Sequence, residues 1–264
     1  ETVDVLGEIT NRLNKEIKVH LKVETGTNRQ GLKKEALLKL AKHIETYPRV
    51  LIEGIATHFA NIEDTRDLSF TLGQIQKLRD AHDLLQQEGI TVPMVHTANS
   101  AATVLLPESH FDIVRVGVMC YGMWPSERVR LSYKDSGQEP LELQPAFTWK
   151  TKVAQVRHAN KGEVVSYGCT HKLSRDTKIA VIPVGYYDGY DRHASDRGAV
   201  LIHGQRARIL GRVAMNMLMV DVTDIEEVTL EDEVVLIGKQ GDDDITADEF
   251  ATWADTINYE ITTR

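Results

Sequence analysis

The sequence predicts a protein with an α/β domain followed by a mainly β domain. In the first half, strand-like and helix-like patterns alternate at roughly 30–40 residue intervals, as in parallel βα units. From about Leu141 onward, β-rich runs follow one another and are joined by turns rich in Gly, Asn and Asp. The polar stretch 125–140 lies between these regions, and we expect domains at residues 1–135 and 136–264.

The first half contains alternating strand and helix candidates. Short β-branched or apolar runs bounded by polar loops predict strands at residues 17–23, 51–59, 91–96 and 113–117. Apolar residues spaced three and four apart predict helices at residues 32–44, 68–87 and 99–105. In the longest of these helices, we expect Leu72, Ile75, Leu78 and Leu85 on the buried face.

The second half contains mostly strand candidates, expected at residues 147–156, 178–183, 199–201, 207–212, 217–222 and 233–237. The run Gly238-Lys239-Gln240-Gly241 predicts a turn after the last of them. Thr246 and Glu249 have the spacing of a capping box and predict the start of a helix.

Composition narrows the class of protein. The chain has 264 residues and a formal net charge of -8, which disfavours sequence-independent nucleic-acid binding because that needs a basic face. The apolar runs are far shorter than the ~20 residues of a membrane span. Two cysteines, Cys120 and Cys169, form no disulfide framework, so a cytoplasmic location is the default expectation.

Polar residues follow each strand candidate of the first half. The strands lead into 24–31, His58, Asn99-Ser100 and Arg115. A single His or Arg at such a place is more often structural, and Asn or Ser is a common helix cap. Four polar strand ends together favour an active site, since enzymes of βα architecture build theirs at the carboxyl ends of strands.

Tyrosines cluster in the second half. Tyr167 follows a strand candidate, and three further tyrosines lie within 186–190. A Tyr-rich turn packed at an interface is the simpler interpretation, because Tyr suits half-wet surfaces.

Taken in order, the motifs resemble those of alanine racemases, the pyridoxal 5'-phosphate (PLP) dependent fold-type III family. The matching stretches are His20-Leu21-Lys22-Val23-Glu24-Thr25-Gly26, Thr57-His58-Phe59-Ala60, His96-Thr97-Ala98-Asn99-Ser100-Ala101-Ala102, Val114-Arg115-Val116-Gly117-Val118, Val165-Ser166-Tyr167-Gly168, Val184-Gly185-Tyr186, Gly211-Arg212-Val213 and Asn258-Tyr259-Glu260. The resemblance implies a (β/α)8 TIM-like barrel followed by a C-terminal β-domain. It also implies a homodimer with active sites at the subunit interface, no metal, and interconversion of L- and D-alanine that supplies D-alanine for peptidoglycan.

The resemblance also implies roles for individual residues. Tyr167 matches one of two bases at the substrate Cα, acting in the site of the other subunit. Arg115 matches the residue that contacts the PLP pyridine nitrogen, and Lys22 one that is carbamylated in many members. His58 matches a residue that supports Arg115. The other matches bind the cofactor, namely Asn99, Ser100, Gly117, Val118 and Tyr259, or the substrate, namely Arg29, Tyr186 and Met215.

The sequence departs from the family pattern in two important places. The Lys-Ala-x-Ala-Tyr-Gly type motif, whose lysine binds PLP, does not occur in these 264 residues. We therefore expect a partial barrel that lacks the N-terminal strands, an absent extreme C-terminus, and a chain that is incomplete alone. Asn216 stands where the family usually has Asp. The alternatives are a serine or broad-specificity racemase of the same fold and a non-catalytic fragment.

Overall fold

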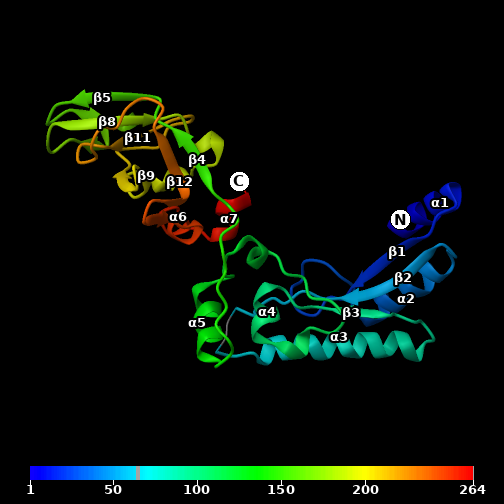
Figure 1. The fold of residues 1–264 in the computed structure, drawn as a ribbon. Coiled ribbons are helices and arrows are strands. Elements are labelled where there is room, and N and C mark those ends of the chain that lie inside the picture. Colours follow the sequence, from blue (N-terminus) through cyan, green and yellow to red (C-terminus); the bar gives the residue numbers. More distant parts are fainter. Residues whose placement is uncertain (64–65, 264) are drawn as a thin grey trace. The chain divides into compact units, whose positions relative to one another are not determined.

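The computed structural model describes residues 1–63 and 66–263. The chain forms two compact units, Glu1–Leu143 and Gln144–Arg264 (Figure 1). Asp135, where the sequence analysis divides the domains, is the last residue of a helix in the first unit. None of the described helices is both long and apolar enough to cross a membrane.

The first unit alternates helices and strands along the chain. Its elements are α1 (Thr2–Leu13), β1 (Ile17–Lys22), α2 (Lys34–Glu45), β2 (Val50–Ala56), α3 (Ser69–Gln87), β3 (Met94–His96), α4 (Ser100–Leu105) and α5 (Glu127–Asp135), with short 3-10 turns at Pro107–Ser109 and Val118–Tyr121. The three strands form one parallel sheet in the order β1-β2-β3.

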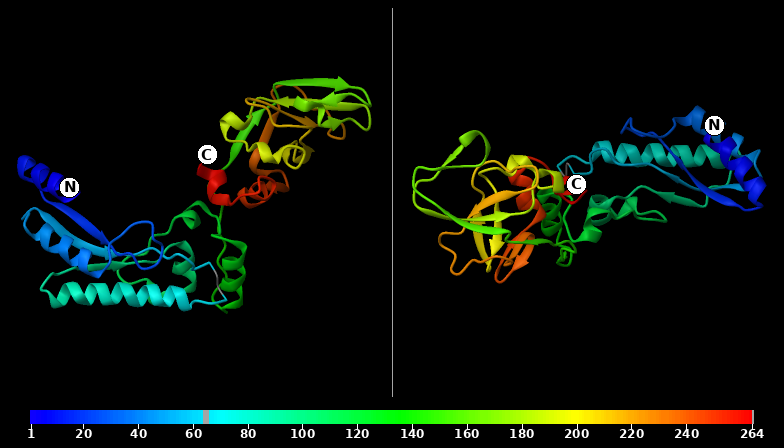
Figure 2. Two further views of the ribbon diagram at one scale, coloured as in Figure 1. Left: turned by 180° about the vertical axis from the view of Figure 1, so that it is seen from behind. Right: turned by 90° about the horizontal axis from the view of Figure 1, so that it is seen from above.

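The core of the first unit lies between this sheet and the helices α2 and α3, which run along it (Figures 1 and 2). One residue from each element illustrates the packing: Leu21, Leu37, Ile55, Leu78 and Val95 are all buried in a single cluster. Side chains alternate across a strand. The opposite face of β1 is therefore polar, and it carries Lys18, His20 and Lys22.

Several predicted elements of the first unit are shorter than expected. The predicted strands at 51–59 and 91–96 shrink to β2 and β3, and Pro93, which lacks an N–H donor, lies just outside β3. No strand forms at 113–117, because only Ile113 pairs with His96, as an isolated β-bridge.

Helices account for the other differences in the first unit. The stretch 125–140 is not merely a polar linker, since it contains α5, capped by the Ser126 side chain that accepts from Val129 N. The helix α1 is not among the elements expected from the sequence. In α3, Leu72 is exposed instead of buried, whereas Gln74 is fully buried.

The second unit is mainly β, as the sequence predicts. Its elements are β4 (Trp149–Lys152), β5 (Gln155–Ala159), β6 (Val164–Val165), β7 (His171–Lys172), β8 (Thr177–Ile182), β9 (Ala199–Ile202), β10 (Gln205–Arg208), β11 (Leu218–Asp221), β12 (Glu233–Gln240), β13 (Asp243–Ile245), α6 (Ala247–Trp253) and α7 (Asn258–Thr263). One sheet has the order β10-β9-β12-β13 with β4 beside β12, another has the order β11-β8-β5, and β6 and β7 form a hairpin.

The predicted strand at 147–156 is wrong as a single element. The chain leaves one sheet and enters the other at Val153 and Ala154, whose N–H groups donate to Asp232 O and Val181 O. The run predicted at 207–212 begins earlier, as β10, and continues only as a bridge from Ile209 to Val220.

The end of β12 and the start of α6 also refine the prediction. The turn expected at 238–241 lies later, because β12 continues to Gln240 and pairs there with Asp243. The capping box is half present. Thr246 Oγ1 accepts from Glu249 N at 3.0 Å, but the Glu249 carboxylate pairs with Arg206 instead of the Thr246 backbone.

Candidate active site

The carboxyl ends of the parallel strands bring polar residues of the first unit to one rim. The register places Lys22 beside Ala56, Ala56 beside His96, and His96 beside Ile113. Residues that follow these positions therefore emerge at the same edge of the sheet, the edge at which βα enzymes bind their ligands.

Arg115 is the centre of this rim. Its Nη1 lies 2.6 Å from His96 Nδ1, and its Nη2 donates to Thr57 O at 2.9 Å and Thr97 O at 3.2 Å. His58 Nδ1 lies 3.5 Å from the same Nη2. Burial lowers the pKa of Arg115, but a guanidinium remains charged at neutral pH. The structure thus holds a fixed hydrogen-bond donor at the rim.

The contact with Arg115 fixes the protonation of two histidines. A guanidinium only donates, so His96 Nδ1 must accept and its proton must lie on Nε2. His96 Nε2 lies 2.8 Å from His20 Nδ1, which therefore accepts in turn. His20 Nε2 then faces Glu53 Oε2 at 3.6 Å, and Glu53 pairs with Lys18. Burial, reinforced by the charge of Arg115, lowers the pKa of His96 to about 4.

His20 and His96 lie in the motifs quoted above, but the resemblance implies no role for either residue. Two signals point to them in retrospect. Lys18, His20 and Lys22 alternate on one face of β1, and Gly54 lies in the middle of β2. A Cβ at Gly54 would collide with the His20 ring, so glycine is required for the ring to lie across the sheet.

Three further residues predicted from the motifs lie around Arg115. The pKa of His58 is lowered by burial first, and then by the charges of Arg29, Arg115 and Lys22. Lys22 Nζ donates to Gln30 Oε1 at 3.0 Å. The first unit thus gathers these cations at one end of its sheet, where they favour an anionic ligand.

Ser100 and Gly117 form a second group at the rim. Ser100 opens α4 and is buried, and its Oγ accepts from Gly117 N at 2.9 Å. A Cβ at Gly117 would have Ser100 Oγ, at 3.9 Å, as its nearest neighbour, so open space lies beside this backbone. Within residues 1–63 and 66–263 the Ser100 hydroxyl accepts this bond and has no acceptor of its own, so its proton can be donated to an anion. Val118 follows as a buried residue, and Asn99 caps α4 by accepting from Ala102 N.

Three of the four predicted site residues of the second unit line one cavity of about 550 Å³. Tyr167, Tyr186 and Met215 all line it, as does Asn216. The full lining is Ser166, Tyr167, Tyr186, Arg192, Val213, Ala214, Met215, Asn216, Met217 and Met219. Tyr259 lies on α7 and does not line it.

Tyr167 occupies a tight turn between β6 and β7. Ser166 has a φ of 66° and donates through Oγ to Arg212 O at 2.5 Å. Gly168 has a φ of 75°, and a Cβ there would come within 2.8 Å of Arg212 Nη1. This turn holds the Tyr167 side chain outward, 72 % exposed. Arg212 at the turn and Arg192 in the cavity supply cations that sequence analysis did not single out.

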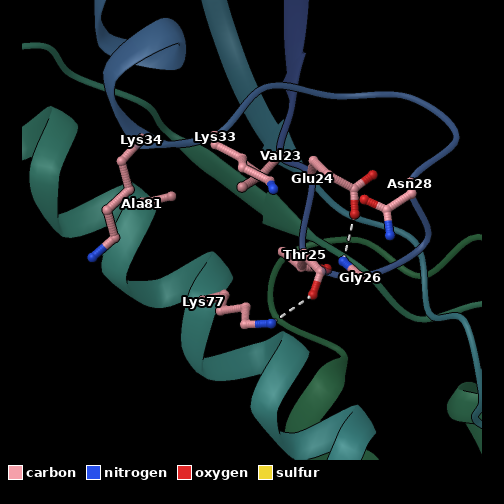
Figure 3. Close-up of a pocket in the computed structure, with 9 residues that line it drawn as sticks. All are labelled: Val23, Glu24, Thr25, Gly26, Asn28, Lys33, Lys34, Lys77 and Ala81. Atoms are coloured by element: carbon pink, nitrogen blue, oxygen red, sulfur yellow. Dashed lines mark hydrogen bonds between the residues drawn. The ribbon is translucent and has the colours of Figure 1, made fainter.

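Another cavity, of about 400 Å³, lies beside the loop that follows β1 (Figure 3). It contains none of the predicted site residues. Lys77 reaches across from α3 to donate to Thr25 O at 3.1 Å, and Glu24 Oε1 accepts from Gly26 N. Lys34 pairs with Asp80 at 3.7 Å. These contacts brace the loop against the helices.

No cluster of three His, Cys, Asp or Glu side chains with the arrangement of a metal site occurs within residues 1–63 and 66–263.

Comparison with known families gives matches along almost the whole chain. The model described as "Alanine racemase, N-terminal domain" matches residues 1–125, and "Alanine racemase, C-terminal domain" matches residues 146–264. An alanine racemase of Leptospira interrogans is 40% identical over 94% of this chain and 63% of its own length. One from Carboxydothermus hydrogenoformans is 45% identical over 97% of this chain and 67% of its own length.

Solved structures give the same result. Alanine racemase from Bacillus anthracis with bound L-Ala-P superposes with a TM-score of 0.87 at 35% identity, covering 98% of this chain and 64% of that one. Alanine racemase from Streptomyces coelicolor gives 0.88 at 31% identity, with 100% and 68% covered. The chain spans less than two thirds of the length of the first relatives it matches.

Proposed function

Because this chain belongs to the alanine racemase family, we propose that it supplies the active-site residues of a PLP-dependent enzyme that interconverts L- and D-alanine. The family match confirms the predicted fold class, a barrel-type α/β domain followed by a β-domain. The observation that carries the proposed activity is the Arg115 cluster, where a permanent donor is fixed by four groups at a strand-end rim.

The rim of the first unit fits PLP chemically. Ser100 Oγ and the backbone N–H groups of Gly117 and Val118 would receive the phosphate, with the Gly117 N–H turning from Ser100 Oγ to the anion, because a hydroxyl and peptide N–H groups suit a dianion. Asn99 would border the phosphate, and Arg115 would donate to the pyridine nitrogen. When bound, PLP withdraws electrons from the substrate Cα and makes its proton removable.

Arg115 would limit that electron withdrawal. Because a guanidinium cannot transfer its proton, Arg115 would leave a pyridine nitrogen that accepts its hydrogen bond largely unprotonated. Neutral His96 on the other side of Arg115 keeps this donor in place. A weaker electron sink restricts the enzyme to proton exchange at Cα and suppresses side reactions such as transamination.

The second unit would supply a base. We propose that Tyr167 holds or removes the Cα proton on one face of the substrate, in the site of a partner subunit. Its exposure and the neighbouring Tyr186 and Met215 support this role, because exposed aromatic and Met side chains are typical of interfaces. Arg192 lines the same cavity as Tyr167, and Arg212 lies beside Gly168 in the same turn.

The remaining predicted residues complete the proposal. Arg29 would bind the substrate carboxylate, and a carbamate on Lys22 would hold Arg29 in place. Tyr259 would contact the phosphate and narrow the pocket toward a methyl side chain. We further propose a homodimeric, cytoplasmic enzyme whose D-alanine enters peptidoglycan.

A second candidate is a serine or broad-specificity racemase. Asn216 favours it, because this residue lines the cavity beside Met215 and carries no negative charge where the family usually has Asp.

The deciding experiment measures racemisation by the intact protein with PLP, using L-alanine, L-serine and L-arginine. A kcat/KM for alanine at least tenfold above the others supports the alanine assignment. Equal values support the broad-specificity alternative. Bound PLP without racemisation of any of the three would refute the proposed activity.

A further inference from the structure

Gln74 is a polar residue in the core of the first unit, and the proposed function gives it no role. It lies in the first half of α3, and its side chain is completely buried. Burying an amide is costly unless its donors and acceptor find partners. Gln74 finds three, and all belong to the loops that follow β1 and β2.

The orientation of the Gln74 amide is unambiguous. The backbone N–H of Ala60 can only donate, so the atom 2.9 Å from it is Oε1. The carbonyl of His58 can only accept, so the atom 3.1 Å from it is Nε2. The second Nε2 proton then points to Thr25 Oγ1 at 2.9 Å.

A one-way chain of hydrogen bonds continues from Thr25. Its Oγ1 accepts from Gln74 and lies 2.7 Å from Thr57 Oγ1. Thr57 Oγ1 is 3.0 Å from Val23 O, which can only accept, so the Thr57 proton goes there. The Thr25 proton must therefore go to Thr57. Both threonines are buried, so water does not compete for these bonds.

The residues bonded in this network, Thr57 and His58, also hold Arg115. Thr57 O accepts from Arg115 Nη2 at 2.9 Å, and His58, whose carbonyl Gln74 binds, has its ring beside the same nitrogen. Gln74 therefore acts on Arg115 indirectly. Its hydrogen bonds fix the backbone between Thr57 and Ala60, and that backbone positions Arg115.

We propose that Gln74 is a positioning residue, which sets the backbone of residues 57–60 and thereby the orientation of Arg115 toward the cofactor. This inference rests on the proposed function, because the consequence for activity requires that Arg115 faces the PLP ring. A misplacement of about 1 Å remote from the reacting atoms can lower a rate by about a hundredfold.

The test is Gln74→Met in the intact PLP-bound protein, since Met keeps the length and removes the amide. We expect kcat per bound PLP to fall about ten- to a hundredfold, the same scale as such misplacements. Normalising to bound PLP separates positioning from a loss of folded protein. Gln86→Met is the matched control, because Gln86 is an exposed residue of the same helix. An unchanged kcat per bound PLP in Gln74→Met would overturn the proposal.

A double-mutant cycle with Thr57→Val sharpens the test. If both side chains act through one chain, the two effects on kcat are not additive. Full additivity would contradict the shared path. If Gln74→Met does not fold, Thr25→Val removes the next hydroxyl of the same hydrogen-bond network and replaces it in the test. A fall in kcat per bound PLP would then support the proposal, and an unchanged value would overturn it.

Hydrogen exchange separates this inference from the proposed function. Gln74→Met should speed amide exchange at residues 57–60, while Gln86→Met should not. If the wild-type protein racemises no amino acid, the proposed function fails. The role of Gln74 is then decided by amide hydrogen exchange at residues 57–60 alone. Unchanged exchange at residues 57–60 would refute it.

Discussion

The two candidate regions differ in how their functional side chains are held. Arg115 is held by hydrogen bonds to His96, Thr57 and Thr97 within its own unit. Tyr167 lies on an exposed turn whose backbone is fixed but whose side chain is 72 % exposed. The first region is organised by its own fold, whereas the second presents its residues outward.

This difference indicates how each region should respond to substitution. The hydrogen bonds that preorganise Arg115 also stabilise the fold around it. A substitution at Arg115 should therefore lower both activity and local stability. An exposed side chain contributes little to folding, and changes at Tyr167 should affect activity alone.

The largest effect is expected from Tyr167→Phe. Loss of a general base lowers rates by about 10²–10⁴-fold. We expect that loss of racemisation, with unchanged PLP binding and thermal midpoint. Exchange of the Cα proton with solvent should persist for one enantiomer only, because the opposing base remains.

Tyr187→Phe is the control for this prediction. Tyr187 is 82 % exposed, adjoins Tyr186 in the sequence and does not line the cavity. Near-normal racemisation by Tyr167→Phe, or an equal loss in the control, would contradict the assignment of the base.

Arg115→Lys should affect both activity and stability. Lysine keeps the charge but cannot reproduce the planar set of donors that reaches His96, Thr57 and Thr97. Removing one preorganised donor lowers kcat by about 10²–10³-fold. Unmade hydrogen bonds should also cost about 1–3 kcal/mol of unfolding free energy.

Denaturant unfolding and steady-state kinetics measure the two effects together. Arg130→Lys is the control, because Arg130 forms an exposed ion pair with Glu127. If Arg115→Lys loses activity without losing stability, Arg115 would behave like Tyr167, and the expected difference between the two regions would be wrong.

Arg115, Ser100 and Gly117 could be proposed from the sequence because motif and chemistry coincide there, and the structure places them at one strand-end rim. Sequence reasoning could not find Gln74. A polar residue in an amphipathic helix is usually exposed, and only packing shows that Gln74 is buried while Leu72 is exposed.

Strand limits were hard to predict for a related reason. Residues 147–156 form one β-favouring run, but the change of sheet at Val153 depends on partners distant in the sequence. Residues 113–117 have a strand-like composition, yet Arg115 N donates to Ala98 O in the loop that follows β3, and only Ile113 forms a β-bridge. Hydrogen-bond partners, and not composition, decide such limits.

His96→Gln should make the first unit less sensitive to acid. In the native protein burial lowers the pKa of His96 to about 4, against 6.5 when unfolded. The unfolded chain therefore gains a proton first as pH falls, so the stability that neutral His96 contributes is complete above pH 6.5 and is lost toward pH 4.

Gln can accept from Arg115 and donate to His20 without titrating. Between pH 7.5 and 5, the wild type should lose about 2 kcal/mol more unfolding free energy than His96→Gln. Denaturant unfolding at both pH values measures this. His193→Gln, at an exposed site of the second unit, should behave as the wild type. Equal acid losses in wild type and His96→Gln would show that His96 titrates freely.

The smallest effect is expected from Thr246→Ala at the start of α6. Its hydroxyl accepts from Glu249 N, and loss of such a cap costs about 1 kcal/mol. Thr246→Ser keeps the oxygen and is the control. Because Arg206 also binds the Glu249 carboxylate, the start of the helix keeps a second contact, and the loss of unfolding free energy should stay small.

Racemisation should not change, since Thr246 lies outside the Tyr167 cavity. A fall in kcat with Thr246→Ala would show that the exposed Tyr167 turn depends on the stability of its own unit, and the contrast with Arg115 would then be one of degree.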